Sequence, residues 1–286
     1  MRRPSVVIRP PSSSAPRVAS SLLAAASAAA ATEADFALAA GNRIVEGVEV
    51  AFDAEARAVR ARHVRRLDQI VLQSAPRAVT PGPEVSAALA TGIAQIGVAR
   101  LPWSKTQTQL RERLSFLIAA GIDDLPDLSD EALGANVAGW LEPYLTGKTR
   151  LDDIGADDLA AALDSLVPWS LRQRLDAEAP MQFEAPTGNR VAIDYDGPQA
   201  PSVQIRVQEL FGLKAHPAIA AGRRPLTLHL LSPAHRPIQI TRDLPGFWAG
   251  SWAAVKTDMK GRYPRHVWPD DPANAAPTAR PKPRGT

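Results

Sequence analysis

The spacing of apolar residues changes twice along the chain. Apolar and polar residues alternate near the start, apolar residues recur every three to four positions in the middle, and alternation returns toward the end. A period of two is typical of half-buried strands, and a period near 3.6 is typical of amphipathic helices. The pattern therefore predicts an α+β chain with a helical middle between two strand-rich segments.

The first strand-rich segment is expected over residues 32–75. A short helix over 33–40 opens it, and three strands follow at about 48–52, 56–66 and 67–73. Three strands are too few for a complete β domain. We therefore expect a partial β-meander whose other strands are missing or supplied elsewhere.

A proline-containing linker over 76–83 leads into a helical middle over 84–178. Five helices are expected there: 84–96, 104–120, 130–141, 157–166 and 169–178. The second should begin with Ser104 as its cap and bury Leu110, Leu114, Leu117 and Ile118. Residues 122–165 hold eleven Asp and Glu against Lys148 and Arg150. Most of these acids lie at helix starts, where they favour the helix dipole, so the acidity has a structural explanation.

Residues 181–272 predict a mixed β/α module. Strands are expected at 181–185, 190–195, 203–207, 226–231 and 238–241, the first two as a hairpin. A helix then begins after Asp243 and ends at Gly261. Its predicted buried face carries Trp248, Trp252, Val255 and Met259. This helix should present the basic segment that follows it at the surface.

Composition adds an uneven charge distribution to this picture. The chain is 45% apolar and 22% charged, as globular chains are. Residues 1–31 are rich in Arg, Pro, Ser and Ala, and we expect a disordered or misassigned leader rather than a secretory signal. Residues 273–286 form a basic, proline-rich tail. The absence of cysteine excludes disulfides and agrees with a cytoplasmic location, and no apolar window is long enough to predict a membrane span.

No catalytic constellation emerges from the motifs. Gly147-Lys148-Thr149 resembles the end of a phosphate loop, but Glu142 stands where that loop needs a glycine, so a helix-ending turn is favoured. The five histidines are scattered, and the paired aspartates are interpreted as helix caps. Neither a serine elbow nor a cysteine nucleophile is present. We therefore predict no cofactor or metal site in this chain.

Basic residues are the candidate binding residues, because arginine at strand or helix spacing can follow a phosphate backbone. The candidates are Arg57, Arg60, Arg62, Arg65 and Arg66 on the second strand, and Lys256, Lys260, Arg262, Arg265 and His266 near the C-terminus. Arg60 and Arg62 are expected on one face of the strand, with Arg57 and Arg65 on the other. A solvated edge protected from aggregation, and a docked helix with a solvated basic end, are the structural alternatives that the residues leave open.

Residues 226–285, which include FWAGSW and VKTDMKGRYPRHVWPDDP, resemble the C-terminal end of bacterial HrpB-type DExH-box ATP-dependent helicases. The similarity extends back through LPWS (101–104), WLEPYL (140–145) and the arginine strand to about residue 40. It implies that 32–75 is part of an OB-fold and that 84–272 is the family's C-terminal domain. The family's motor motifs have no counterpart here, so ATP and Mg²⁺ would bind in motor domains that this sequence lacks.

The resemblance implies an accessory region of an ATP-dependent helicase that binds single-stranded RNA or DNA, without ATPase activity of its own. The alternative is a protein-interaction module, in which the acidic helical middle docks on a helicase motor or another partner. We expect the first residues to come from a mispredicted start, or from a truncated or split gene.

Overall fold

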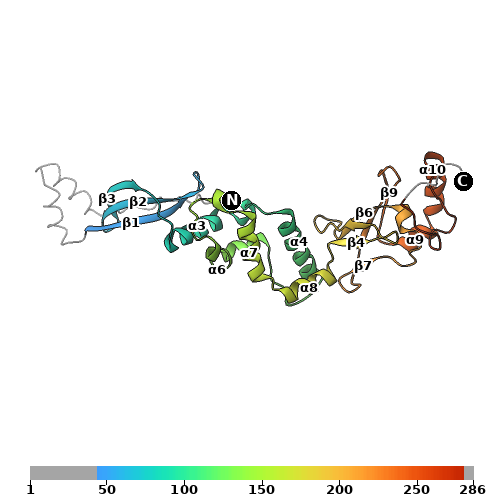
Figure 1. Cartoon of the computed structure of the whole chain (residues 1–286), viewed down its shortest axis with the longest axis horizontal. Coiled ribbons are helices and arrows are strands. Elements are labelled where there is room, and N and C mark those ends of the chain that lie inside the picture. The colour runs from blue at the N-terminus through green and yellow to red at the C-terminus, as the bar shows by residue number, and fades with distance from the viewer. Residues whose placement is uncertain (1–43, 280–286) are drawn as a thin grey trace, which may run out of the picture. The chain divides into compact units, whose positions relative to one another are not determined.

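The computed structural model describes residues 44–279 and contains both helices and sheets (Figure 1), which confirms the α+β class. The chain divides into two compact units. The first comprises residues 1–50 and 60–78, and the second comprises 51–59 and 79–286. The predicted leader, the predicted helix over 33–40 and the last seven residues of the basic tail lie outside the described residues.

A three-stranded sheet with the order β1-β2-β3 forms the described part of the first unit. The strands are β1 (Ile44–Asp53), β2 (Ala58–Leu67) and β3 (Ile70–Arg77). β2 and β3 are antiparallel, with an irregular register between Arg65 and Arg66. Three strands were predicted correctly, but β3 continues into the expected linker. Whether this sheet is part of an OB-fold stays a prediction.

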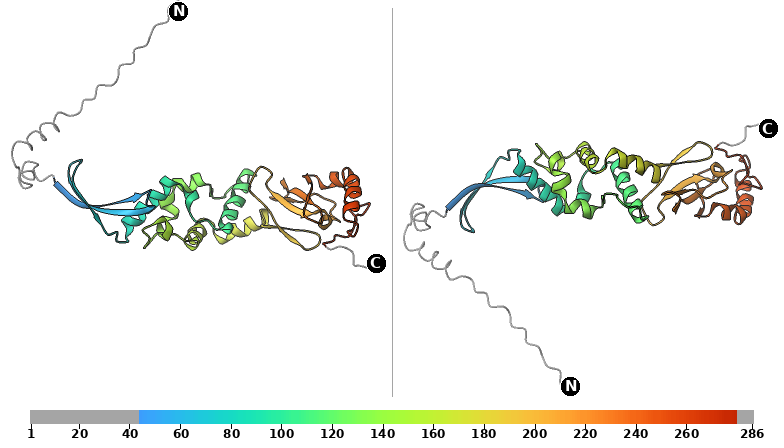
Figure 2. Two further views of the ribbon diagram at one scale, coloured as in Figure 1. Left: turned by 90° about the horizontal axis from the view of Figure 1, so that it is seen from above. Right: turned by 90° about the horizontal axis from the view of Figure 1, so that it is seen from below.

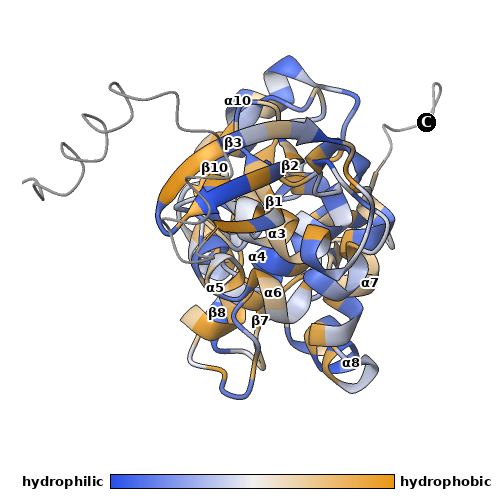
Figure 3. Ribbon diagram, turned by 90° about the vertical axis from the view of Figure 1, so that its left-hand side faces the viewer, coloured by the Kyte–Doolittle hydropathy of each residue, from blue (hydrophilic) through white to orange (hydrophobic). Residues whose placement is uncertain are grey.

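The surface of this sheet carries exposed apolar side chains, namely Val45, Val48, Ile70, Val71 and Leu72. Figure 3 shows hydrophobic stretches on β3 and hydrophilic ones on β2. That the meander is part of a larger β domain stays a prediction.

The helical part of the second unit follows the sequence pattern closely. Its long helices are α3 (Pro83–Ile96), α4 (Lys105–Ala119), α7 (Ala156–Leu166) and α8 (Trp169–Glu178). Ser104 caps α4 as predicted, because its hydroxyl accepts from the Gln107 amide while Gln107 Oε1 accepts from the Ser104 amide at 2.8 Å. Short 3₁₀ helices connect the long ones: η1 (Val98–Arg100), η2 (Glu142–Tyr144) and η3 (Leu151–Asp153).

Two predictions in the helical part were wrong. The helix expected over 130–141 is two short helices, α5 (Asp130–Ala135) and α6 (Val137–Trp140), because Asn136 leaves the helical region at φ −134° and ψ 38°. On α4, Ile118 is 40% exposed, whereas Arg113 is buried.

The mixed module contains a hairpin and a three-stranded sheet. The hairpin pairs β4 (Gln182–Glu184) with β5 (Arg190–Ala192). The sheet has the order β10-β9-β6, and β6 (Ser202–Arg206) runs parallel to β9 (Thr227–Leu231), while β10 (Pro237–Thr241) is antiparallel to β9. The 3₁₀ helix η4 (Val207–Leu210) follows β6, and a small pair, β7 (Ala218–Ile219) with β8 (Arg224–Pro225), was not predicted.

The aromatic helix predicted after Asp243 is two helices, α9 (Leu244–Ala249) and α10 (Trp252–Arg262), which Figure 2 shows near the β6–β9–β10 sheet. Asp243 caps α9 as predicted, since its Oδ1 accepts from the Gly246 amide at 2.9 Å. Gly250 interrupts the helix at φ −102° and ψ −92°. Gly261 lies inside α10, whose C-cap is Tyr263, so the predicted end was wrong.

Candidate nucleic-acid interface

A cluster of aromatic rings supports the basic segment near the C-terminus. Trp252 is 2% exposed, and its ring meets Phe211 edge-on at 5.5 Å and Trp248 edge-on at 5.4 Å. Such edge-to-face pairs add to the free energy gained by burying the rings. Phe211 follows η4, so the cluster joins α9 and α10 to the part of the chain that follows β6.

The indole N–H groups also fix the segment that follows α10. Trp252 Nε1 donates to the carbonyl oxygen of Pro269 at 3.0 Å, and Trp268 Nε1 donates to that of Tyr263 at 3.0 Å. The two bonds hold both ends of residues 263–269 in place. Arg265 and His266 are therefore presented on an ordered segment rather than on a free tail.

The five predicted cations of this region differ in their surroundings. Lys256 Nζ lies 2.5 Å from Asp270 Oδ1, and Arg262 Nε lies 2.9 Å from Asp258 Oδ1. Lys260 and Arg265 are exposed and make no ion pair within residues 44–279. Exposed ion pairs are weak and open readily, so all four cations can reach a polyanion.

His266 is half-buried and lies between positive groups. Burial lowers its pKa first, and the guanidinium groups of Arg206 and Arg265 lower that pKa further. The ring meets Tyr263 edge-on at 6.2 Å. The lowered pKa favours the neutral ring, which can donate or accept a hydrogen bond.

Arg206 was missed among the candidate residues. It is the last residue of β6, between the buried Ile205 and Val207, and a lone arginine in an apolar strand carries no phosphate-binding signal. Its Nε donates to Glu209 Oε1 at 2.8 Å. Only the packing of β6 near the C-terminal segment reveals that it acts on His266.

The arginines of β2 form a separate group in the first unit. Arg60 and Arg62 are exposed and share one face, as predicted. The other two are ion-paired with β1, since Arg65 Nε lies 2.7 Å from Glu46 Oε1 and an Arg66 Nη lies 2.6 Å from Glu49 Oε1. Arg60 and Arg62 are the arginines of the strand whose side chains are most exposed.

Arg57 does not lie on the strand, and its predicted face was wrong. It occupies the turn before β2 with a left-handed backbone at φ 51°, within the second unit. Its guanidinium lies 3.3 Å from Asp152 Oδ1, and its carbonyl accepts from the Leu151 amide at 2.9 Å. These contacts fasten the turn to η3, so Arg57 has a structural role.

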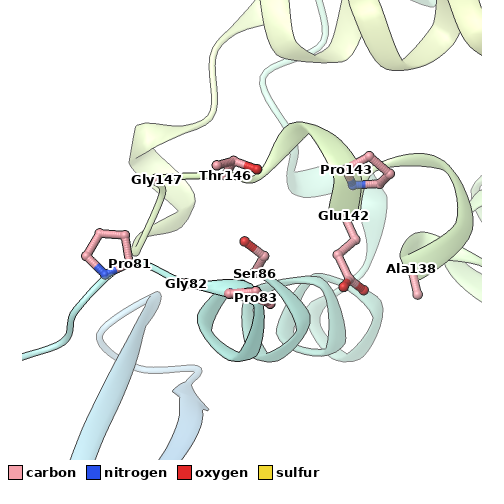
Figure 4. Close-up of a pocket in the computed structure, with 9 residues that line it drawn as sticks. All are labelled: Pro81, Gly82, Pro83, Ser86, Ala138, Glu142, Pro143, Thr146 and Gly147. Carbon is pink, nitrogen blue, oxygen red and sulfur yellow. The ribbon is translucent and has the colours of Figure 1, made fainter.

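The Gly147-Lys148-Thr149 segment borders a pocket of about 440 Å³ (Figure 4). Pro81, Pro83 and Pro143 contribute apolar walls, and a 3₁₀ helix rather than a strand precedes Gly147. Lys148 Nζ lies 2.8 Å from Asp158 Oδ2, where it is neutralised. Within residues 44–279, no group of three or more His, Asp or Glu could hold a metal ion, and no helix there is long and apolar enough to cross a membrane.

Residues 140–272 match the family described as "ATP-dependent helicase C-terminal". The chain is 44% identical over 219 residues to the ATP-dependent RNA helicase HrpB of Escherichia coli strain K12, a stretch that covers 76% of this chain and 27% of that protein.

Two solved structures are also similar. One is the E. coli DExH-box NTPase HrpB, with a TM-score of 0.68 at 40% identity, covering 87% of this chain and 31% of that chain. The other is the E. coli DEAH/RHA helicase HrpB, with a TM-score of 0.60 at 38% identity, covering 79% of this chain and 29% of that chain. The chain thus spans less than a third of each relative. In sequence and in fold, it is similar to the C-terminal part of HrpB-type ATP-dependent helicases.

Proposed function

We propose that this region contributes nucleic-acid binding to an ATP-dependent helicase, and that its ligand is single-stranded RNA. The observation that carries the proposal is the basic segment from Lys256 to His266, which is held by the indole hydrogen bonds of Trp252 and Trp268 and exposes Lys260 and Arg265. Cations fixed on an ordered surface bind a phosphate backbone at a lower entropic cost than cations on a mobile tail. RNA is preferred to DNA because the curated relative is named an RNA helicase.

The arginines of β2 are proposed as a second, weaker contact with the same strand. Arg60 and Arg62 are exposed on one face, a spacing that suits successive phosphates. Glu46 and Glu49 would compete with phosphate for the guanidinium groups of Arg65 and Arg66. ATP and Mg²⁺ would be bound by motor domains rather than by the residues of this sequence.

Fluorescence anisotropy with a labelled single-stranded RNA tests the proposal. Affinity should fall by more than tenfold between about 50 mM and 200 mM salt, because neutralising several phosphates releases counterions. The double variant Arg262→Glu/Arg265→Glu should lose most of this affinity. A control that reverses two exposed charges elsewhere in the second unit, Arg100→Glu/Lys105→Glu, should bind almost as the wild type does. No binding by the wild type at the lower salt concentration would refute the proposal.

An exposed aromatic groove favours a second candidate function, docking on a helicase motor or another protein. Trp169 is 73% exposed and Met181 is 46% exposed, and both line a groove of about 340 Å³ with residues of α4 and α7. Exposed tryptophans are enriched in protein interfaces. If Trp169→Ala abolishes capture of separately expressed motor domains and leaves RNA affinity unchanged, the groove serves a protein partner.

A further inference from the structure

We propose that the carboxyl ends of the parallel strands β6 and β9 form a discrete site for one phosphodiester group of single-stranded RNA, contributed by Arg206, Arg236, Arg265 and His266. The inference rests on the proposed function and deepens it, since it assigns a defined site to part of the basic surface and adds two arginines from outside the C-terminal segment.

The sheet register places Arg206 and the turn after β9 at the same end of the sheet. Arg206 is the Cα partner of Leu231, the last residue of β9. The chain then turns from Ser232 to Arg236, where the Ser232 amide donates to the Arg236 carbonyl at 2.8 Å and the Arg236 amide donates to Ser232 Oγ at 3.1 Å. Ligands of sheets with parallel strands commonly bind at the carboxyl ends of the strands.

The end of α10 reaches the same place. Ser232 Oγ lies 3.4 Å from the Tyr263 hydroxyl, so the β9–β10 turn contacts the C-cap of α10. Tyr263 in turn accepts the His266 amide at 3.1 Å and contacts the His266 ring. Two hydrogen bonds therefore connect the turn that carries Arg236 to the segment that carries Arg265 and His266.

The charges at this end of the sheet are mostly positive. Arg206 and Arg265 both act electrostatically on His266. Glu209 is the nearby acid, but it is 2% exposed and its oxygens already accept from Arg206, Asn189 and Thr187. Arg236 and Arg265 are exposed and make no ion pair within residues 44–279. A positive potential therefore remains for an anion to neutralise.

The chemistry of these groups suits a phosphodiester. Guanidinium groups recognise phosphate oxygens through paired N–H donors. Glu209 holds Arg206 in one orientation, so little conformational entropy is lost when Arg206 binds an oxygen. His266 gains a proton more easily once an anion lies beside it, because the anion offsets the repulsion from Arg206 and Arg265.

A double-mutant cycle tests whether Arg236 and Arg265 hold the same phosphate. Arg236→Gln and Arg265→Gln should each weaken RNA binding about tenfold. The fold-loss of affinity in the double variant should be clearly smaller than the product of the two single fold-losses, because residues that bind the same phosphate are energetically coupled. Arg206→Lys keeps the positive charge but removes the paired N–H donors of the guanidinium group, so it should also weaken RNA binding. The control Lys105→Gln should bind RNA as the wild type does.

Ring NMR signals of His266 give an independent measurement. Saturation with RNA should raise the pKa of His266, and inorganic phosphate alone should do so only at far higher concentration. Three results would each overturn the site. The single variants could bind RNA as the wild type does, their losses of affinity could be additive in the double variant, or His266 could respond to inorganic phosphate but not to RNA. If the site fails while Arg262→Glu/Arg265→Glu still loses RNA affinity, the proposed function stands without it. If the wild type does not bind RNA, both proposals fall.

Discussion

Arg113 of α4 is hydrogen-bonded to Asp176 of α8 and to Ala179, which follows that helix. Its side chain is 5% exposed, and it donates to the Ala179 carbonyl at 2.6 Å and to Asp176 Oδ1 at 2.5 Å. A buried guanidinium is tolerated only when its donors are satisfied. Periodicity predicted that α4 buries Ile118 and gave no sign that it buries Arg113. The helical pattern shows which residues are apolar, but it does not show which charged residues have buried partners.

We therefore predict that Arg113→Ala lowers the free energy of unfolding by about 2 kcal/mol, since it removes a buried guanidinium and leaves the Ala179 carbonyl without its donor. Urea denaturation measures the change. Arg190→Ala is the matched control, because Arg190 and Glu184 form an exposed pair at 3.2 Å that should contribute less than about 1 kcal/mol. Equal losses for the two variants would contradict this account of Arg113.

The lowered pKa of His266 predicts a pH dependence of stability. Burial, Arg206 and Arg265 lower this pKa in the folded state, whereas the unfolded chain has the ordinary value of about 6.5. Below about pH 6.5 the unfolded chain binds the proton more readily than the folded protein does. The free energy of unfolding is therefore highest above pH 6.5, and it falls as the pH drops toward the pKa of the folded state.

The measurement is urea denaturation at several pH values between 7 and 5. The wild type should lose more stability over this range than His266→Gln, which has no titrating ring. Parallel pH profiles for the two proteins would show that His266 does not contribute.

At the scale of elements, Phe52 near the end of β1 packs closely on α3 within the second unit. A Cβ on Gly92 of α3 would lie 2.0 Å from Cγ of Phe52, far inside any real contact. The glycine is therefore required by the aromatic ring that packs on the helix rather than by the helix itself.

Gly92→Ala should destabilise the protein by about 1–3 kcal/mol through overpacking, although glycine-to-alanine changes in helices usually stabilise them. Gly134→Ala in α5 is the control, because nothing lies within 4 Å of its added Cβ. Thermal unfolding should lower the Tm of the first variant and leave the second equal or higher. A raised Tm for Gly92→Ala would mean that the Phe52 ring moves aside freely.

The elements were predictable wherever local chemistry decides them. The helix caps Ser104 and Asp243 were predicted correctly, because the side chain that starts a helix is adjacent to it in sequence. The breaks at Asn136 and Gly250 were missed, since the apolar spacing continues through both. The basic residues follow the same division: apolar spacing placed Lys256 and Lys260 on a helix, whereas the position of Arg206 depends on a parallel strand pairing that no local pattern encodes.

At the scale of the whole molecule, the chain is similar to the C-terminal part of much longer proteins, and it spans 27% of one curated relative. The residue closest to a phosphate-loop lysine, Lys148, is already paired with Asp158. We therefore predict no ATP hydrolysis above background in a phosphate-release assay of the purified chain. Hydrolysis that Lys148→Ala abolishes would show that the Gly147 turn binds nucleotide after all.

The tryptophans that anchor the C-terminal segment also give the protein an optical reporter. Trp268 is half-buried and its indole is hydrogen-bonded to Tyr263, three residues before His266, whereas Trp169 stands 73% exposed in the helical part. The two indoles should therefore emit at different wavelengths and be quenched to different extents by iodide. A ligand that settles on Arg265 and His266 should change the emission of Trp268, and Trp268→Phe should silence this response while Trp169→Phe preserves it. The binding of unlabelled ligands could then be measured by the intrinsic tryptophan fluorescence of the protein.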